Sequence, residues 1–307
     1  NTTGCLNTAS GYRALKSNTT ASFNTSVGGC SLFANTTGTN NTAVGYQALK
    51  TNECSNDNTA VGTYALCLTT GHSNVAVGKS AVQANSTGAL NTGIGKFALS
   101  SNTTACYNTA VGFCTLYTNT TGHGNTIGGF LAAAKSTCAD YNTGWGHKAL
   151  CDATTGSYNV ALGACVLTGN TTATNNVAVG YRAMKAATTG GGNVAVGGVA
   201  LESLTTAEYN IAMGKYALNG VTTGCRNTGL GAFAGYAVTT GVRNTLVGQS
   251  AGGQITTGSH NTGSGYKVLN FLTTGCFNVA HGYHAGYCTT SGNYNVSMGF
   301  AALRGNT

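Results

Sequence analysis

The stretch Asn41-Thr42-Ala43-Val44-Gly45-Tyr46-Gln47-Ala48-Leu49 contains the pattern that decides the fold. Eighteen times in the 307 residues, an Asn is followed directly by Thr, Val or Ile, and a Gly stands four residues after that Asn. Successive copies are 17 residues apart, except for a step of 16 from Asn58 to Asn74. Counting this Asn as position 0, position 4 is Gly in every copy. So short and unbroken a repeat is typical of a solenoid, whose coils bury apolar residues only against neighbouring coils.

Two segments of each repeat predict short strands. Position 2 is mostly small and position 3 mostly Val, Ile, Leu or Met, an alternation typical of a strand with positions 1 and 3 on the same side. We expect the Val and Leu ladders to lie inside. The invariant Gly permits a bend or a positive φ, and Ala and Leu at positions 7 and 8 predict a second strand. Thr-Thr-Gly near positions 12 to 14 closes the coil, and an Asn ladder at position 0 satisfies buried backbone groups.

The predicted fold class is therefore all-β, a parallel β-solenoid (β-roll) of about 18 coils with a 17-residue repeat. Thr, Asn and Gly are weak helix formers, which argues against helices. No linker or composition shift divides the chain, so we expect one solenoid rod over residues 1–307, about 85 Å long at a rise of about 4.8 Å per coil.

Composition excludes several other classes. The chain has 47 Gly, no Pro, 7% charged and 41% hydrophobic residues, with the apolar residues in register. Collagen needs Gly at every third residue, and disorder needs low hydrophobicity with high net charge. No apolar run is long enough for a membrane span, and no signal peptide is visible.

The run Asn74-Val75-Ala76-Val77-Gly78-Lys79-Ser80-Ala81 resembles the coil repeat of trimeric autotransporter adhesin heads, and it is similar to repeats in some phage tail fibres. The resemblance covers essentially the whole chain. It implies a left-handed parallel β-roll used for attachment or as a spacer. The 17-residue period is longer than the repeat usual in those heads, and cysteine is abundant here.

Twelve cysteines are more than the repeat requires, and some recur at matched spacing. Disulfide candidates are Cys54 with Cys67, Cys138 with Cys151, and Cys276 with Cys288. We expect such pairs to face each other in adjacent coils, within the Cα separation that a disulfide needs. Disulfides would imply an oxidising, extracellular location. The alternative is that Cys replaces Ala or Ser as a small filler.

Catalytic and metal sites are weakly represented. Six acidic residues leave little for paired-carboxylate chemistry, and no Ser, His and Asp constellation is apparent, so we expect no enzyme and no cofactor. Cys276, His281, His284 and Cys288 are capable of binding zinc, but their coil positions would point them in different directions. His281, like Trp145, replaces Val at a position that we expect to face inward.

Basic and aromatic residues recur after the invariant Gly. Eleven of the 14 Lys and Arg residues occupy positions 5, 6 or 9, and a Tyr or Phe occupies position 5 or 6 in 12 copies. In one interpretation, the basic residues solubilise the surface and the aromatic residues cover a corner of the coil. In the other, they form a contact surface for a sister chain or a surface polyanion. We favour lateral self-association, because a long aromatic row is costly to leave in water. Representatives of this stripe are Tyr12, Tyr46, Lys79, Lys96, Phe113, Tyr181, Lys215 and Tyr266.

Asn-x-Ser/Thr triplets offer possible N-glycosylation sites. Most fall at position 11, which we expect to lie in an outer turn. These are Asn18, Asn35, Asn85, Asn102, Asn119 and Asn170.

The leading hypothesis is a structural, extracellular fibre or filament segment, in a cell-surface appendage or virion fibre. An alternative is an adhesin or tail-fibre module that binds a surface glycan or polyanion, and a remote one is an ice-binding solenoid. Adjacent Thr-Thr pairs argue against the last, because they point to opposite sides. Nucleic acid and membrane insertion are not expected as partners. Asn1 enters the repeat at position 11, and Asn306 and Thr307 leave it at positions 11 and 12, so we expect a longer polypeptide or head-to-tail stacking.

Overall fold

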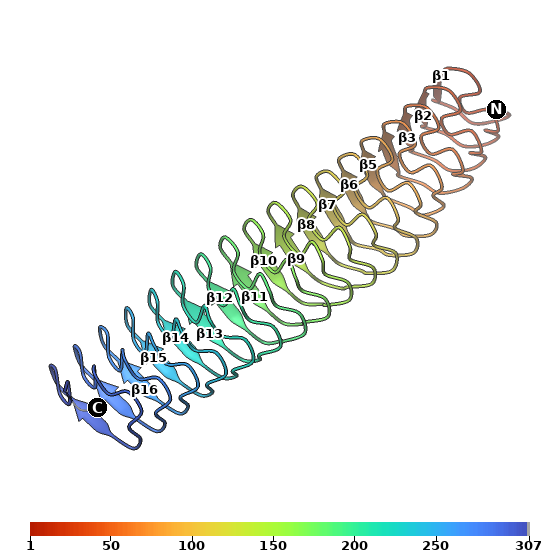
Figure 1. Cartoon of the computed structure of the whole chain (residues 1–307). Coiled ribbons are helices and arrows are strands. Elements are labelled where there is room, and N and C mark those ends of the chain that lie inside the picture. The colour runs from red at the N-terminus through yellow and green to blue at the C-terminus, as the bar shows by residue number, and fades with distance from the viewer. Residues whose placement is uncertain (306–307) are drawn as a thin grey trace. The chain divides into compact units, whose positions relative to one another are not determined.

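The computed structural model describes residues 1–305, which form strands and turns without a helix. They fall into two compact units, Asn1–Thr155 (unit 1) and Gly156–Thr307 (unit 2). Each unit is a stack of coils with nine parallel strands, one strand to a repeat (Figure 1). The predicted all-β solenoid with a 17-residue repeat is thereby confirmed. The expectation for Asn306 and Thr307 lies outside the described residues.

The strands of unit 1 occupy positions 1 to 3 of successive repeats. Thr42 lies opposite Thr59, and Thr59 lies opposite Val75, so the register survives the single 16-residue repeat. That missing residue is absorbed in the turn near position 12, because Asn85 still bonds to Thr69 across the coils at 2.9 Å. The strands are β1 (Thr8–Ser10), β2 (Thr25–Val27), β3 (Thr42–Val44), β4 (Thr59–Val61), β5 (Val75–Val77), β6 (Thr92–Ile94), β7 (Thr109–Val111), β8 (Thr126–Gly128) and β9 (Thr143–Trp145).

Unit 2 repeats the same arrangement with a more apolar strand. Val177 lies opposite Val194, and Val194 lies opposite Ile211. The strands are β10 (Val160–Leu162), β11 (Val177–Val179), β12 (Val194–Val196), β13 (Ile211–Met213), β14 (Thr228–Leu230), β15 (Thr245–Val247), β16 (Thr262–Ser264), β17 (Val279–His281) and β18 (Val296–Met298).

The strand faces the opposite way from the sequence prediction. The small residue at position 2 points inward, as Ala43 and Ala60 do with no exposed surface, whereas Val44 and Val61 at position 3 are each 37% exposed. Trp145 and His281, expected to face inward, are exposed as well. The reason is that Leu at position 8 fills the narrow interior and leaves room for only a small side chain under the strand.

Side-chain size at positions 2 and 8 is complementary. Gly93 lies at position 2, and a Cβ there would come within 2.5 Å of Val82 Cγ2 at position 8. The reverse case occurs at Leu246, a large residue at position 2, whose neighbours at position 8 are Gly235 and Gly252. A Cβ on Gly252 would lie 2.7 Å from Leu246 Cδ2. Large and small side chains are therefore exchanged between the two positions, and the side-chain volume in the core is conserved.

The second predicted strand does not form. Position 6 and position 8 have positive φ, as in Gln47 (56°) and Leu49 (51°), which places them in the left-handed region instead of the β region. The coils are nevertheless bonded here: Leu49 N–H donates to Ala65 O at 3.1 Å. Each coil thus has one strand, followed by turns whose backbone bonds still run to the neighbouring coils.

Two Asn ladders hold the corners of the coil. At position 0, Asn41 N–H donates to Asn24 Oδ1 at 2.9 Å, and Asn41 Nδ2 donates to Ser55 O of its own coil at 2.8 Å. The predicted role of this ladder is confirmed. A second ladder at position 11 joins Asn35 Nδ2 to Asn18 Oδ1 at 3.1 Å. In unit 2 this corner becomes apolar in most coils, with buried side chains at Ala187, Leu204, Val221, Val238, Ile255 and Leu272.

The Gly at position 4 is required by backbone conformation and by close approach. Gly45 has a φ of +134°, and a Cβ on it would lie 2.6 Å from the carbonyl oxygen of Gly62. No other L residue fits such a site without displacing the next coil. This explains why position 4 is Gly in all 18 copies.

Candidate functional site

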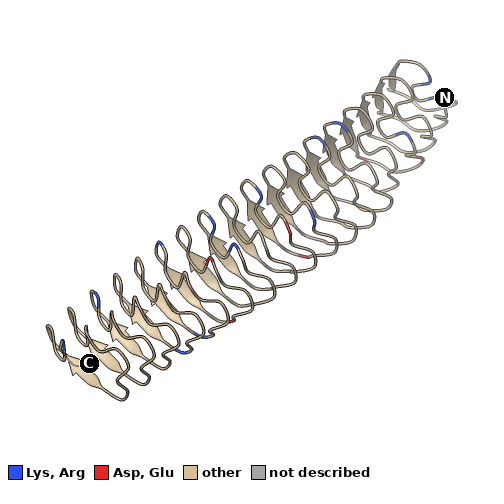
Figure 2. Ribbon diagram, in the orientation of Figure 1, with Lys and Arg blue, Asp and Glu red and all other residues tan. Residues whose placement is uncertain are grey.

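The aromatic–basic stripe follows the invariant Gly at the loop after each strand. We define it by Tyr12, Tyr46, Lys79, Lys96, Phe113, Tyr181, Lys215 and Tyr266. All of these side chains are exposed except that of Tyr266, which is half-buried. Figure 2 shows that the basic residues recur along the ribbon of each unit and that acidic ones are sparse. Most of this row is thus accessible, and its role stays a prediction.

The rings of the stripe stack on their neighbours in adjacent coils. In unit 1, the Phe113 and Phe130 centroids are 5.4 Å apart with an interplanar angle of 13°, and Phe130 stacks on His147 at 5.5 Å. In unit 2, Tyr266 stacks on Tyr283 at 5.3 Å, and Tyr283 stacks on Phe300 at 5.2 Å. Such stacking restrains exposed rings before any partner binds.

Several cations of the stripe lie against ring faces. Lys96 Nζ is 5.0 Å from the centroid of Phe97 and 5.8 Å from that of Phe113. Lys215 Nζ is 5.2 Å from the ring of Tyr216. Cation–π attraction at exposed sites amounts to about 0.5–1 kcal/mol. The stripe is therefore an aromatic surface with cations laid over it.

A second exposed aromatic row was missed by the sequence analysis. It lies at position 16, directly before the Asn of the next repeat, and Phe277 stacks there between His260 at 4.7 Å and Tyr294 at 5.0 Å. Recurrence of Tyr or Phe immediately before the Asn was the available signal. The row comprises Phe23, Tyr107, Tyr141, Tyr158, Tyr209, Phe277 and Tyr294.

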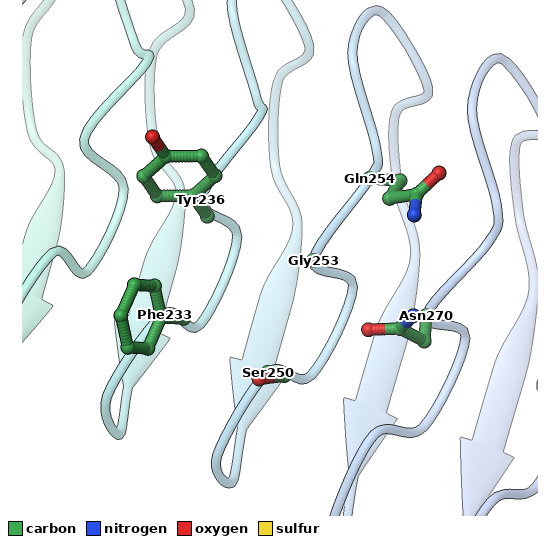
Figure 3. A pocket seen from close by; sticks show the side chains of 6 residues that line it. All are labelled: Phe233, Tyr236, Ser250, Gly253, Gln254 and Asn270. Carbon is green, nitrogen blue, oxygen red and sulfur yellow. The ribbon is translucent and has the colours of Figure 1, made fainter.

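A hollow lies on the outer surface of unit 2, and the sequence analysis did not find it. It measures about 230 Å³. Figure 3 shows two aromatic rings on one side and two amide side chains on the other, with Ser250 and Gly253 between them. The lining residues are Phe233, Tyr236, Ser250, Gly253, Gln254 and Asn270.

The predicted glycosylation sites do not lie in an outer turn. Asn35, Asn85, Asn102, Asn119 and Asn170 have no exposed surface, and Asn18 is 3% exposed. Their amides are engaged: Asn102 Nδ2, for example, donates to Asn85 Oδ1 at 2.8 Å and to Ala105 O at 3.1 Å. A glycan on this nitrogen would replace an N–H of the ladder and has no room. The outer-turn prediction was wrong because position 11 is an inside corner.

The three predicted disulfides do not form within residues 1–305, where none of the twelve cysteines is bonded to another cysteine. In-register stacking places residues 17 apart opposite each other, as Thr42 and Thr59 are. Residues 13 apart, such as Cys54 with Cys67 and Cys138 with Cys151, therefore occupy different places on the coil, and so do Cys276 and Cys288. Cys54 is exposed whereas Cys67 is buried.

Some cysteines have structural roles of their own. At position 15 the side chain accepts a backbone N–H from the preceding coil, and sulfur does so at Cys106, 3.3 Å from Ala89 N, and at Cys276, 3.4 Å from Ser259 N. Burial raises the pKa of the Cys67 thiol, an effect that the nearby charge of Lys50 opposes. A raised pKa lowers the thiolate fraction of Cys67 and with it the reactivity of the thiol.

The histidines near the end of unit 2 do not gather with cysteines. Within residues 1–305 no group of three His, Cys, Asp or Glu side chains is placed to hold a metal ion. His284 instead stacks on Tyr283 at 4.1 Å and on Tyr287 at 4.4 Å. Loss of solvation in this stack, and then the positive charges of Arg304 and Lys267, lower the pKa of His284.

Comparison with known proteins assigns no family. No protein-family model matches the chain, and a search of curated proteins found no related sequence. Over the described residues, no helix is long and apolar enough to cross a bilayer.

Proposed function

We propose that this chain is a structural segment of an extracellular fibre, in which the solenoid sets distance and resists unfolding. The observation that supports this most directly is the continuity of bonding between coils within each unit. Around one coil, Thr42, Leu49 and Thr36 each donate a backbone N–H to the next coil, at distances of 2.8 to 3.1 Å. The Asn ladder adds a further bond at each coil. Stability then accumulates from neighbour to neighbour, as a spacer requires.

The extracellular setting is supported by the resemblance of the repeat to adhesin heads and tail fibres. The free cysteines remove the disulfide argument that the sequence had suggested. No catalytic role forms part of the proposal.

Within this function, the aromatic–basic stripe packs against sister chains. Tyr12 is 70% exposed, Tyr181 57% and Tyr46 48%, and apolar ring surface of this kind favours burial. Rings that already stack in adjacent coils lose little side-chain freedom on association. Lysines laid over these rings would lie at the rim of the contact.

Sedimentation velocity of the chain over a range of concentrations tests lateral association. We expect oligomers for the unaltered protein and monomers for a triple variant with Tyr46, Phe113 and Tyr181 replaced by Ser. A matched variant with Lys79, Lys96 and Lys215 replaced by Gln should keep its oligomers. A chain that stays monomeric up to high concentration would refute lateral association. Loss of binding to anionic surfaces in the Lys variant alone would favour the adhesin alternative.

Ice binding is a second candidate that one specific observation favours. The argument against it came from the Thr-Thr pairs, and these do diverge: Thr36 Oγ1 donates to Glu53 O at 3.0 Å, whereas Thr37 is exposed. Strand positions 1 and 3, however, both face outward and form two parallel rows in unit 1. Examples are Thr42 with Val44 in β3 and Thr59 with Val61 in β4.

These rows form a regular two-dimensional array. Neighbouring strands lie about 4.8 Å apart and alternate residues of one strand about 6.6 Å apart. A regular, uncharged array of methyl and hydroxyl groups can order water. Thermal hysteresis of the chain tests this, and Thr59→Tyr should abolish it while Thr121→Tyr, at an exposed turn position, should not. No hysteresis in the unaltered protein removes this candidate.

A further inference from the structure

In unit 2, the outward-facing side chains at positions 6 and 9 are small in one coil, and the hollow lies at that coil. At position 6 the successive residues are Phe233, Ser250 and Lys267, and at position 9 they are Tyr236, Gly253 and Asn270. Both middle residues are small. Adjacent coils are about 4.8 Å apart, so the backbones of the coils on either side of the small residues are about 10 Å apart. This space arises from two coincident small residues in the same coil.

One wall of the hollow is aromatic, and its rings pack against a further ring outside the hollow. Phe233 stacks on Tyr216 at 5.1 Å and 17°, and Tyr236 contacts both rings, at 5.8 Å from Phe233 and 6.1 Å from Tyr216. Phe233 is 38% exposed and Tyr236 43%, so ring surface remains open toward the hollow. A braced ring presents a fixed face to a ligand.

The other side and the floor are polar and neutral. The side chains of Ser250, Gln254 and Asn270 make no hydrogen bond within residues 1–305, and no charged residue lines the hollow (Figure 3). A hydroxyl and two amides supply both donors and acceptors. Asn270 Oδ1 lies close to Gly253, since a Cβ placed on Gly253 would lie 2.9 Å from this oxygen.

We propose that this hollow binds one neutral sugar ring of a surface glycan. A pyranose has a C–H face that suits the negative face of an aromatic ring, and hydroxyls that suit amide groups. A single sugar ring can lie about 4 Å from the aromatic face and about 3 Å from an amide group. An anion lacks a cation in the lining. This binding goes beyond the structural role and does not depend on it.

Saturation-transfer NMR on the whole chain tests the proposal with neutral oligosaccharides of glucose, mannose, galactose and N-acetylglucosamine. At least one is expected to bind. Tyr236→Ala removes the aromatic wall, and Gly253→Asn fills the gap with the residue that Asn219 and Asn270 provide at this position in other coils. Each change should weaken binding at least about tenfold, which corresponds to about 1.4 kcal/mol.

Tyr209→Ala removes an exposed ring of unit 2 that lies outside both the hollow and the aromatic–basic stripe, so it is the matched control and should leave binding unchanged. Thermal melting of the three variants shows whether each still folds, and Gly253 has no positive φ that would strain a side chain. The proposal is overturned if none of the four sugars binds, if only an anionic glycan such as hyaluronan binds, or if Gly253→Asn binds as well as the unaltered chain. None of these results affects the proposed structural role.

Discussion

Asn125 donates its backbone N–H to Oδ1 of Asn108, 17 residues earlier, at 2.9 Å. This bond is repeated along the stack of each unit, and within residues 1–305 the buried N–H of Asn125 has no other partner. Asn108 Nδ2 at the same time bonds to Gly122 O at 2.8 Å, closing its own coil. One side chain type therefore joins coils to each other and fixes the shape of each coil.

Replacing Asn108 by Ala should destabilise unit 1. The N–H of Asn125 would remain buried without a partner, at a cost of about 1–3 kcal/mol. Gly122 O keeps a bond from Asn119 Nδ2, so the loss is concentrated on one donor. Chemical denaturation measures the change, and Thr121→Ala, an exposed turn residue of the same coil, should change stability by less than about 0.5 kcal/mol. Equal effects of the two substitutions would contradict a structural role for the ladder.

Gly45→Ala should be among the most damaging single-methyl additions. It forces an L residue to a φ of +134° and places Cβ 2.6 Å from the Gly62 carbonyl oxygen. Backbone strain of this kind costs about 1–3 kcal/mol before the next coil is displaced. Gly198→Ala is the control, because nothing lies within 4 Å of its Cβ position. Differential scanning calorimetry should show a lowered Tm for the first variant only; a Tm equal to that of Gly198→Ala would be evidence against the close-approach explanation.

The fold was predictable from the sequence because a strict repeat leaves a parallel stack as the one way to bury each coil. The direction of the strand was not predictable from Val44 and Ala43 alone. Hydrophobicity favours Val inside, but the volume left by Leu49 admits only Ala. The turn at Leu49 was hidden too, because a left-handed Leu is rare. It is held here by the Leu49 N–H bond to Ala65 O of the next coil and by the Asn52 N–H bond to Leu49 O within the same coil.

The candidate site, too, was only partly predictable from the sequence. Recurring Tyr, Phe and Lys at positions 5 and 6 sufficed to predict an exposed row. The hollow beside Gly253 depends instead on which residues meet across three coils, and no single repeat shows it. The buried corner at Asn102 was mistaken for an outer turn because Asn-Thr-Thr is typical of exposed turns, while the amide ladder that buries it exists only between coils.

The complementary side-chain sizes at positions 2 and 8 give a prediction for the core of unit 2. Leu246→Ala should destabilise it by about 2–5 kcal/mol, because Gly235 and Gly252 cannot fill the cavity. Gly252→Leu alone should also destabilise, through a clash with Leu246. The double variant restores the usual Ala and Leu combination at these positions and should recover much of the loss. A double-mutant cycle by chemical denaturation measures this coupling, and strictly additive effects would show that the two sites pack independently.

The stack around His284 should make the stability of unit 2 depend on pH. Its pKa is lowered from 6.5 by lost solvation first and then by Arg304 and Lys267, so near that pH the unfolded chain binds more protons than the folded one. The stabilising contribution of neutral His284 is thus complete above pH 6.5 and is lost as pH falls through the lowered folded pKa. His284→Phe keeps a ring between Tyr283 and Tyr287 without the titrating group, and its Tm should fall less than that of the unaltered chain between pH 7.5 and 5. NMR titration of the imidazole provides the direct measurement, and a His284 pKa at or above 6.5 would show that the stack does not disfavour the charged form.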